Sequence, residues 1–335
     1  MRVQNPLASL ARLVVRRDPL DAQLIITRRC NLSCGYCSEY DHSSAPVPLD
    51  ALRSRLDAIH RLRALNITLL GGEPLMHPDL VAIVEHAAKH AQVSITTNGF
   101  LLTQEIIERL NGVGLSNIQL SVDLFGKDPS GYVQKSWATL RPKLRLLQRY
   151  ATFDVHVNVV LCEGTKTTFS SLWRELGEMG LRVSVDILHD HNGLVQIGGP
   201  DYVALWDELF EKGTPLSYAE HGYGRQLLSG ERPKWKCRAG ARMLYVDEFG
   251  KVQHCSAQRG RLDAPIESYT ARDLRVQWGQ HKGCEEGCAV LCGYRDSLID
   301  NRPVAAIGAF IRLISQGGLS SRARVPEGST ALSSG

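Results

Sequence analysis

The sequence predicts an α/β protein whose main body is a partial (β/α)6 barrel of the TIM type. Between residues 23 and 190, short β-branched or apolar runs alternate with segments of helical periodicity. This alternation is typical of repeated βα units around a parallel sheet. Successive strands begin about 24 to 43 residues apart, which is enough for a right-handed crossover through a helix. Six such units are present, fewer than a closed TIM barrel contains.

Each expected strand is a short run rich in Val, Ile, Leu and Thr, residue types that suit extended backbone. These runs cover residues 23–27, 66–70, 93–97, 117–122, 154–161 and 182–188. Between them, apolar residues recur at helical spacing, so each helix has one apolar face for the sheet. The helices are expected at 49–62, 78–90, 103–110, 137–150 and 169–179.

The character of the sequence changes after residue 193. A helical stretch at 201–211 leads into a run at 213–233 that contains Gly and Pro and predicts irregular structure. Five cysteines then occur within 56 residues, which indicates a second domain stapled by metal. We therefore expect an N-terminal amphipathic helix at 1–22, the barrel at 23–195, a cysteine-rich domain at 196–302, and a C-terminal helix with a mobile tail at 303–335.

Composition and charge exclude several classes of protein. Of the 335 residues, 43% are apolar and 22% are charged, and no apolar run approaches the roughly 20 residues of a membrane-spanning helix. The net charge of +4 is uneven, because residues 1–29 carry +4, residues 301–335 carry +3 and the middle carries −3. This distribution predicts no basic groove for nucleic acid. No secretory signal precedes the nine cysteines, so we expect metal-binding thiols in a reducing cytoplasm.

The first cysteine group lies directly after the first strand, at the end of the barrel where active sites form. Cys30, Cys34 and Cys37 have the spacing C-x3-C-x2-C, with Tyr36 just before the last of them. Three thiolates can hold three irons of a cubane cluster and leave the fourth iron open for chemistry. By themselves they cannot complete a tetrahedral zinc site. The alternative interpretation is a set of structural thiols.

This cysteine pattern resembles the signature of the radical S-adenosylmethionine (SAM) enzymes, and the resemblance continues in order over residues 23–190. The Gly-Gly-Glu-Pro segment at 71–74 is similar to the family motif that meets the amino group of SAM. The Thr-Asn-Gly segment at 97–99 and the Ser-Val-Asp segment at 121–123 are similar to family motifs that end the third and fourth strands.

One departure from the family pattern affects the expected contact with the SAM carboxylate. The family often has Gly after Ser-Leu-Asp and a nearby Arg that holds this carboxylate, whereas here Leu124 follows Asp123 and Lys135 is the basic candidate. The SAM-binding residues implied by the resemblance are Tyr36, Gly71, Gly72, Glu73, Pro74, Asn98, Ser121, Asp123 and Lys135.

The resemblance implies a radical SAM enzyme, either an oxidoreductase or a radical-mediated transferase. A [4Fe-4S] cluster on Cys30, Cys34 and Cys37 would cleave SAM reductively to a 5′-deoxyadenosyl radical, which abstracts hydrogen from the substrate. Such cleavage requires a strong reductant, and thiolate-ligated clusters reach potentials as low as about −700 mV. A low-potential partner of the flavodoxin or ferredoxin type would supply the electron.

The second cysteine group has two parts. Cys237 and Cys255 bracket a segment of hairpin composition with a turn near 248–250, and Cys284, Cys288 and Cys292 follow as C-x3-C-x3-C. The first part, with Gly five residues before its second Cys, resembles the auxiliary-cluster domains called SPASM or, in a shorter form, twitch. Five cysteines favour one auxiliary [4Fe-4S] cluster with four ligands and a spare thiol, whose identity stays open. The alternative is a structural zinc site in a non-catalytic binding scaffold.

Weaker candidates lie near the expected mouth of the barrel. His189 and His191, with Asp186 and Asp190 beside them, could orient a substrate or move a proton. The alternative is a solvated loop with a turn at residues 192–193. Cys162 ends the fifth strand and could donate hydrogen to a product radical, although a buried inert thiol is the commoner outcome.

The sequence leaves the substrate open. We expect a small molecule or a lipidic compound, with a peptide as the alternative. Many peptide-modifying relatives carry a leader-binding domain before the barrel, whereas 22 residues precede the first strand here. The basic, amphipathic ends of the chain predict either peripheral contact with an anionic membrane or helices packed over the barrel. We expect a cytoplasmic protein.

Overall fold

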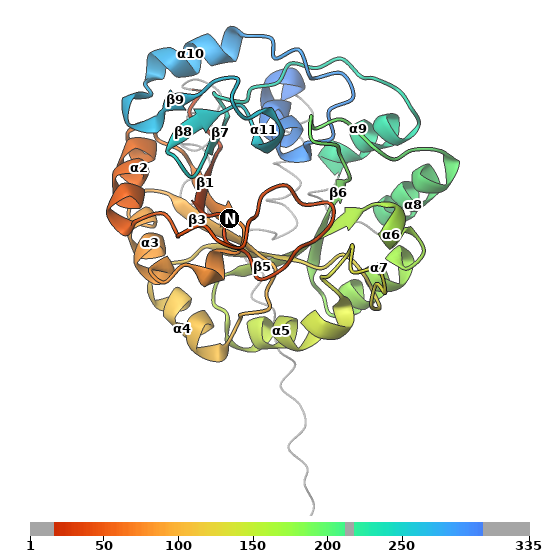
Figure 1. Ribbon diagram of the computed structural model, residues 1–335. Helices are drawn as coiled ribbons and strands as arrows, with labels where there is room; N and C mark the ends of the chain where they lie inside the picture. Colours follow the sequence, from red (N-terminus) through yellow and green to blue (C-terminus); the bar gives the residue numbers. More distant parts are fainter. Residues whose placement is uncertain (1–16, 212–217, 304–335) are drawn as a thin grey trace, which may run out of the picture.

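The computed structural model describes residues 17–211 and 218–303, which form a curved sheet with helices on its outer side (Figure 1). Six parallel strands make the barrel: β1 (Asp21–Thr27), β2 (Asn66–Gly71), β3 (Gln92–Thr97), β4 (Asn117–Ser121), β5 (Asp154–Leu161) and β6 (Arg182–Ile187). Three more follow: β7 (Met243–Val246), β8 (Lys251–Gln253) and β9 (Ala264–Pro265). The strand order is β6-β5-β4-β3-β2-β1-β7-β8-β9. The predicted partial barrel is therefore confirmed.

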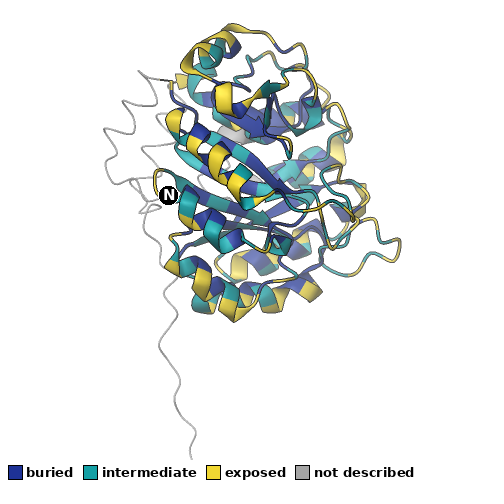
Figure 2. Cartoon of the chain, turned by 60° about the vertical axis from the view of Figure 1, so that its left-hand side comes forward, coloured by how far each residue is buried: buried dark blue, intermediate teal, exposed yellow. Residues whose placement is uncertain are grey.

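Most of the helices lie outside the curved sheet, whereas the last of the described helices follows β9 and lies inside the ring beside β7 (Figure 1). They are α2 (Leu49–Arg61), α3 (Leu80–Ala87), α4 (Gln104–Gly112), α5 (Trp137–Tyr150), α6 (Glu163–Lys166), α7 (Phe169–Glu178), α8 (Pro200–Glu211), α9 (Tyr218–Leu228), α10 (Ala271–Gly279) and α11 (Leu291–Asn301). Their apolar faces and the outward residues of the strands form one core, which includes Leu56, Ile83 and Leu69. Figure 2 shows these helices with buried residues turned to the sheet and exposed residues turned to solvent.

The inner, concave face of the sheet is polar. Side chains alternate between the two faces of a strand, so Ile67 and Leu69 are buried against the helices while Asn66 and Thr68 lie on the inner face. Both donate hydrogen bonds to Asp21 Oδ1 of β1, at 2.7 and 2.8 Å. A closed TIM barrel fills this space with branched apolar side chains. The inner face of this sheet instead offers hydrogen-bonding groups.

The sheet continues from the barrel into the region of the second cysteine group. Strand β7 pairs in parallel with β1, with Asp21 opposite Met243 and Leu24 opposite Val246. Strands β7 and β8 form the expected hairpin, and Gly250 in its turn has φ +82°. A Cβ atom at Gly250 would lie 2.7 Å from Arg55 Nε of α2, so glycine lets the hairpin approach the barrel closely.

Helix α9 is the main difference from the sequence-based expectation, because it occupies part of the run at 213–233 that predicted irregular structure. It packs against α8, and a Cβ atom at Gly224 would lie 2.2 Å from Trp206. Gly224 has a low intrinsic helix propensity, but it makes room for the Trp206 ring. The packing of α9 against α8 therefore outweighs the low helix propensity of glycine.

Residues 1–16 and 304–335 of the expected terminal helices lie outside the described residues. Residues 17–22 are not helical, contrary to the prediction, because β1 pairs with its neighbours from residue 21 onward. Within the described ranges, none of the helices has the length and apolar character needed to cross a membrane.

Candidate active site at the carboxyl ends of the strands

The first cysteine group occupies the loop after β1, which we call the cluster loop (residues 28–41). Cys34 is buried, Cys30 is partly exposed and Cys37 is exposed. The backbone N–H of Leu32 donates to Cys30 Sγ at 3.4 Å, and that of Glu39 donates to Cys37 Sγ at 3.5 Å. Such bonds favour the thiolate form that binds iron.

The protonation state of these thiols depends on whether a cation is bound. Burial raises the pKa of the Cys30 and Cys37 thiols. A thiol with a raised pKa stays protonated at neutral pH unless a cation lies beside it, and a bound metal deprotonates it outright. Binding of a [4Fe-4S] cluster would therefore convert these thiols to thiolates.

The Gly-Gly-Glu-Pro segment lies directly against the start of the cluster loop. Gly72 N–H donates to Thr27 O at 2.8 Å and Glu73 N–H donates to Arg29 O at 2.9 Å. Gly71 has φ +145°, and a Cβ atom there would lie 1.9 Å from Thr27 O. At Gly72 a Cβ atom would lie 2.3 Å from the carbonyl oxygen of Arg28. Both positions therefore require glycine.

Glu73 joins this segment to the Thr-Asn-Gly segment after β3. Its side chain is fully buried and accepts hydrogen bonds from Thr97 Oγ1 at 2.6 Å, from Asn98 N–H at 2.7 Å and from Leu75 N–H at 2.9 Å. Asn98 in turn donates to Asn31 Oδ1 at 2.8 Å. Glu73 thus aligns two strand ends with the cluster loop, whereas the sequence predicted it only as a SAM contact.

A third group of polar side chains surrounds Asp123, just after β4. Asp123 is buried, and its carboxylate accepts from Tyr36 Oη and from Val160 N–H at 3.0 Å, while Lys135 Nζ lies 2.9 Å away. Burial opposes the charge on Lys135, but Asp123 and nearby Cys34 outweigh it and raise the pKa of the ammonium. The predicted basic candidate is therefore charged, and it faces Tyr36 of the cluster loop at 5.1 Å from the ring centre.

Asn158 and Ser184, which the sequence analysis missed, extend this site across β5 and β6 to Asp186. Ser121 pairs in register with Asn158, whose side chain donates to Asp186 Oδ2 at 2.9 Å and accepts from Ser184 Oγ at 2.7 Å. The signal that could have found Asn158 is the alternation of His and Asn with Val along residues 154–161.

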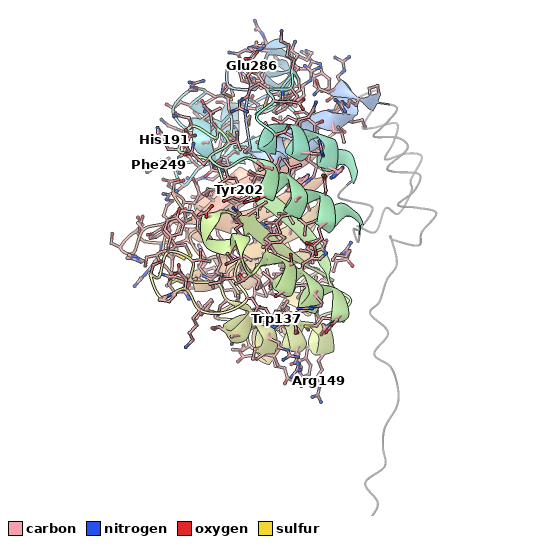
Figure 3. The ribbon with its side chains drawn as sticks, turned by 90° about the vertical axis from the view of Figure 1, so that its right-hand side faces the viewer. Trp137, Arg149, His191, Tyr202, Phe249 and Glu286 are labelled. Carbon is pink, nitrogen blue, oxygen red and sulfur yellow. The ribbon has the colours of Figure 1, made fainter. Side chains whose placement is uncertain are left out.

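The weaker candidates lie apart from the cluster loop. Asp190 accepts from the N–H groups of Asn192 and Leu194, which makes the predicted turn. His191 is exposed and lies at the margin of the molecule in Figure 3. Among the described residues, neither His189 nor His191 has a hydrogen bond to the cluster loop, and both bond within their own turn.

Cys162 lies in a small apolar cluster with Leu124 and Val133. Its side chain is 1% exposed, and burial raises the pKa of its thiol. This environment suits an inert buried thiol better than a hydrogen donor.

The second cysteine group gathers between the hairpin and α11. Cys237, Cys255 and Cys288 share one buried cluster, and Cys292 packs against it. Burial raises the pKa of all five thiols, Cys284 included. Next to Cys255, the buried His254 Nδ1 has no hydrogen-bond partner in the described structure, which points to a bound group or a water beside it. No three Cys, His, Asp or Glu side chains of the described ranges form a ready-made site for a metal ion.

Comparison with known proteins identifies the family. The family model of the radical SAM superfamily matches residues 24–162. The AdoMet-dependent heme synthase of Methanosarcina barkeri is 33% identical over 69% of this chain and 74% of its own length. The chain belongs to the radical SAM superfamily. Enzymes of this family use a [4Fe-4S] cluster and SAM, which agrees with the predicted cofactors.

Other radical SAM relatives differ in what their names say they act on. A PqqA peptide cyclase of Gluconobacter oxydans is 35% identical over 71% of this chain and 70% of its own length. A probable GTP 3′,8-cyclase of Methanopyrus kandleri is 28% identical over 50% of this chain, which spans 57% of that relative.

Solved structures of radical SAM proteins share the fold at low sequence identity. The enzyme anSMEcpe with bound AdoMet and a peptide has a TM-score of 0.59 at 16% identity, over 90% of this chain and 99% of its own. Streptococcus suis SuiB bound to S-adenosylmethionine has a TM-score of 0.61 at 16% identity, over 78% of this chain and 66% of its own.

Proposed function

We propose that this chain cleaves SAM reductively at a cluster on Cys30, Cys34 and Cys37 and then abstracts hydrogen from a polar substrate. The observation that carries the proposal is the convergence of three strand ends on the cluster loop. Gly71 and Gly72 lie against its backbone, Glu73 connects it to Asn98, and the Asp123 group reaches it through Tyr36 and Lys135.

Each of these parts has a task in the proposed reaction. When bound, the cluster supplies the electron that splits SAM into methionine and the 5′-deoxyadenosyl radical. The half-buried backbone of the Gly-Gly pair would bind the amino group of SAM, and the Lys135 ammonium would attract its carboxylate. Asp123 and Tyr36 hold Lys135 in place. The buried Glu73 keeps Asn98 oriented toward Asn31 in the cluster loop.

We propose one auxiliary [4Fe-4S] cluster at the second cysteine group. Cys237, Cys255 and Cys288 are buried together and would be three of its ligands. The fourth ligand would be either Cys284 or Cys292. Cys292 lies near Gln23 of β1 and Asp186 of β6, so it is the thiol directed at the barrel.

For the substrate we favour a peptide. A relative named PqqA peptide cyclase is 35% identical over most of this chain, and the polar inner face of the sheet, with Asp21, His156, Asn158 and Asp186, suits polar groups. A lipidic substrate gains nothing from such a lining. The second candidate is a polar small molecule, supported by the relative named AdoMet-dependent heme synthase.

The cleavage step is tested by replacing Cys30, Cys34 and Cys37 together with Ala. With reduced flavodoxin or dithionite, the variant should form no 5′-deoxyadenosine, while the iron of the second cysteine group remains. Cys162→Ala is the matched control and should behave as the wild-type chain does. Undiminished cleavage by the triple variant would contradict the proposal, and colourless protein that contains zinc would support the binding-scaffold alternative.

The substrate class needs a separate experiment. Peptides encoded next to the gene are prepared with deuterium on their side chains and incubated with the reduced enzyme and SAM. Transfer of deuterium into 5′-deoxyadenosine is expected if a peptide is the substrate, because hydrogen abstraction moves the label. No transfer from any of these peptides, with transfer from a deuterated polar small molecule, would favour the second candidate.

A further inference from the structure

The carboxylate of Glu39 connects the cluster loop to residues 237–292, which contain the second group of cysteines and are called the second cysteine region below. Its Oε2 atom accepts from Arg28 Nη1 at 3.1 Å and from Tyr245 Oη, and Arg259 Nη1 lies 3.8 Å away. Arg28 follows β1, whereas Tyr245 belongs to β7 and Arg259 follows Cys255 by four residues. One carboxylate therefore binds groups from both parts of the molecule.

On the cluster-loop side, this contact lies next to a proposed cluster ligand. The backbone N–H of Glu39 donates to Cys37 Sγ at 3.5 Å. Arg28 Nη2 also donates to the carbonyl oxygen of Ser38 at 2.8 Å. Arg28 and Glu39 thus hold the two residues that follow Cys37, and with them the N–H group that points at its sulfur.

On the other side, the partners of Glu39 are themselves held in place. Tyr245 is fully buried, and burial together with Glu39 raises the pKa of its hydroxyl, which therefore stays a donor. Arg259 also pairs with Glu248 in the turn of the hairpin. The hairpin that precedes Cys255 is therefore held in a fixed position against the cluster loop.

We propose that Glu39 is a positioning residue through which the second cysteine region orients the Cys37 segment and sets the reduction potential of the cluster bound there. The inference rests on the proposed function, because it assigns a cluster to Cys37. Hydrogen bonds to cluster sulfurs and the net charge nearby are main determinants of cluster potentials. Residues that orient metal ligands typically change activity by roughly 10- to 100-fold when they are replaced.

Two variants separate the charge of Glu39 from its link to β7. Glu39→Gln keeps the size of the side chain but leaves Arg28 without this carboxylate and Arg259 with that of Glu248. The added positive charge favours the reduced cluster, so the potential should rise and formation of 5′-deoxyadenosine should fall by roughly tenfold or more. Tyr245→Phe keeps the carboxylate and removes only the hydroxyl. It should loosen the loop and weaken the N–H contact with Cys37 Sγ, so the potential should shift less than it does in Glu39→Gln.

The experiment combines a redox titration with hydrogen exchange on the purified holoenzyme. Electron paramagnetic resonance follows the SAM-responsive cluster signal, and mass spectrometry follows amide exchange over residues 38–41. Glu163→Gln is the matched control, because Glu163 also accepts from a tyrosine hydroxyl, that of Tyr202, but joins α6 to α8. We expect a raised potential for Glu39→Gln, faster exchange for both Glu39→Gln and Tyr245→Phe, and wild-type values for the control.

Two results would contradict the inference or the proposed function. A wild-type potential and wild-type exchange in Glu39→Gln would overturn the inference while the proposed function stands. The absence of any SAM-responsive signal in the wild-type chain would refute the proposed function instead, and with it a role of Glu39 in setting a potential.

Discussion

Asp123 shows how much of the site depends on a single side chain. It is buried at the end of β4 and binds Tyr36, Lys135 and the N–H of Val160. The sequence analysis named Tyr36 and Asp123 from their places in motifs, and Lys135 as the basic candidate where the sequence departs from the family pattern. The contact between them depends on how the loop at 124–136 folds back over the cluster loop, where Gly35 N–H donates to Tyr132 O at 2.9 Å.

Asp123→Asn should destabilise the protein and weaken SAM binding. The substitution removes one partner of a buried ion pair and leaves the Lys135 ammonium without its anion, a change that typically costs about 3–5 kcal/mol. Asp50→Asn is the matched control, because the Asp50 side chain in the pair with Arg53 is 95% exposed and such pairs contribute about 0–1 kcal/mol. Urea unfolding measures both. Equal unfolding midpoints for the two variants would contradict the assigned role.

Strand β5 has the bounds that the sequence predicts and carries a neutral histidine on its polar inner face. The sequence predicts a strand at 154–161, and the structure has β5 over the same residues. His156 and Asn158 stand on its polar inner face, where the two ring nitrogens of His156 lie 3.1 Å from Asn117 Oδ1 and 2.9 Å from Gln119 Oε1. Burial lowers the pKa of His156 to about 3. This strand therefore carries an imidazole that stays neutral in the folded protein.

The free energy of unfolding should decrease as the pH is lowered, because His156 stays neutral in the folded protein. An unfolded histidine has a pKa of about 6.5. On acidification the histidine of the unfolded chain is therefore protonated first, while the ring in the folded protein stays neutral. The contribution of the neutral ring is complete above about pH 6.5 and is lost by up to about 1.4 kcal/mol per pH unit as the pH falls toward 3. Urea unfolding at pH 7 and pH 5 measures this loss. His156→Gln should show a smaller decrease, and the exposed His191→Gln should keep the wild-type decrease; identical pH dependence in all three would refute the assignment.

At the scale of the whole molecule, the barrel and the second cysteine region share one sheet. Strand β7 pairs with β1, and two arginines of α2 bind backbone oxygens of the cysteine region: Arg55 that of Glu248 at 3.0 Å, and Arg61 that of Glu267 at 2.9 Å. The contact at Glu39 adds a third connection. Two cysteine groups that lie about 200 residues apart in the chain are thereby held on one rigid support.

Iron analysis tests the expected number of clusters. Protein purified without oxygen should hold about eight irons per chain, four for each cubane. Cys255→Ala should lose about four of them, because it removes a ligand of the second group, whereas Cys162→Ala should retain all. Mössbauer spectroscopy with metal analysis measures both. A reproducible value near twelve would contradict the single auxiliary cluster, and zinc in place of about four irons would indicate a structural metal site.

The sequence by itself determined the features that depend on neighbouring residues. Strand and helix positions follow from hydrophobic periodicity, and Cys30, Cys34 and Cys37 share one loop because they fall within eight consecutive residues. The hairpin around Gly250 follows from turn chemistry in the same way. The tertiary structure alone decided that Glu39 meets Tyr245, 206 residues away, that Asn158 meets Asp186, and that α9 forms around Gly224. These contacts depend on strand order, register and packing between elements, and local residue preferences carry no information about which distant side chain will lie opposite.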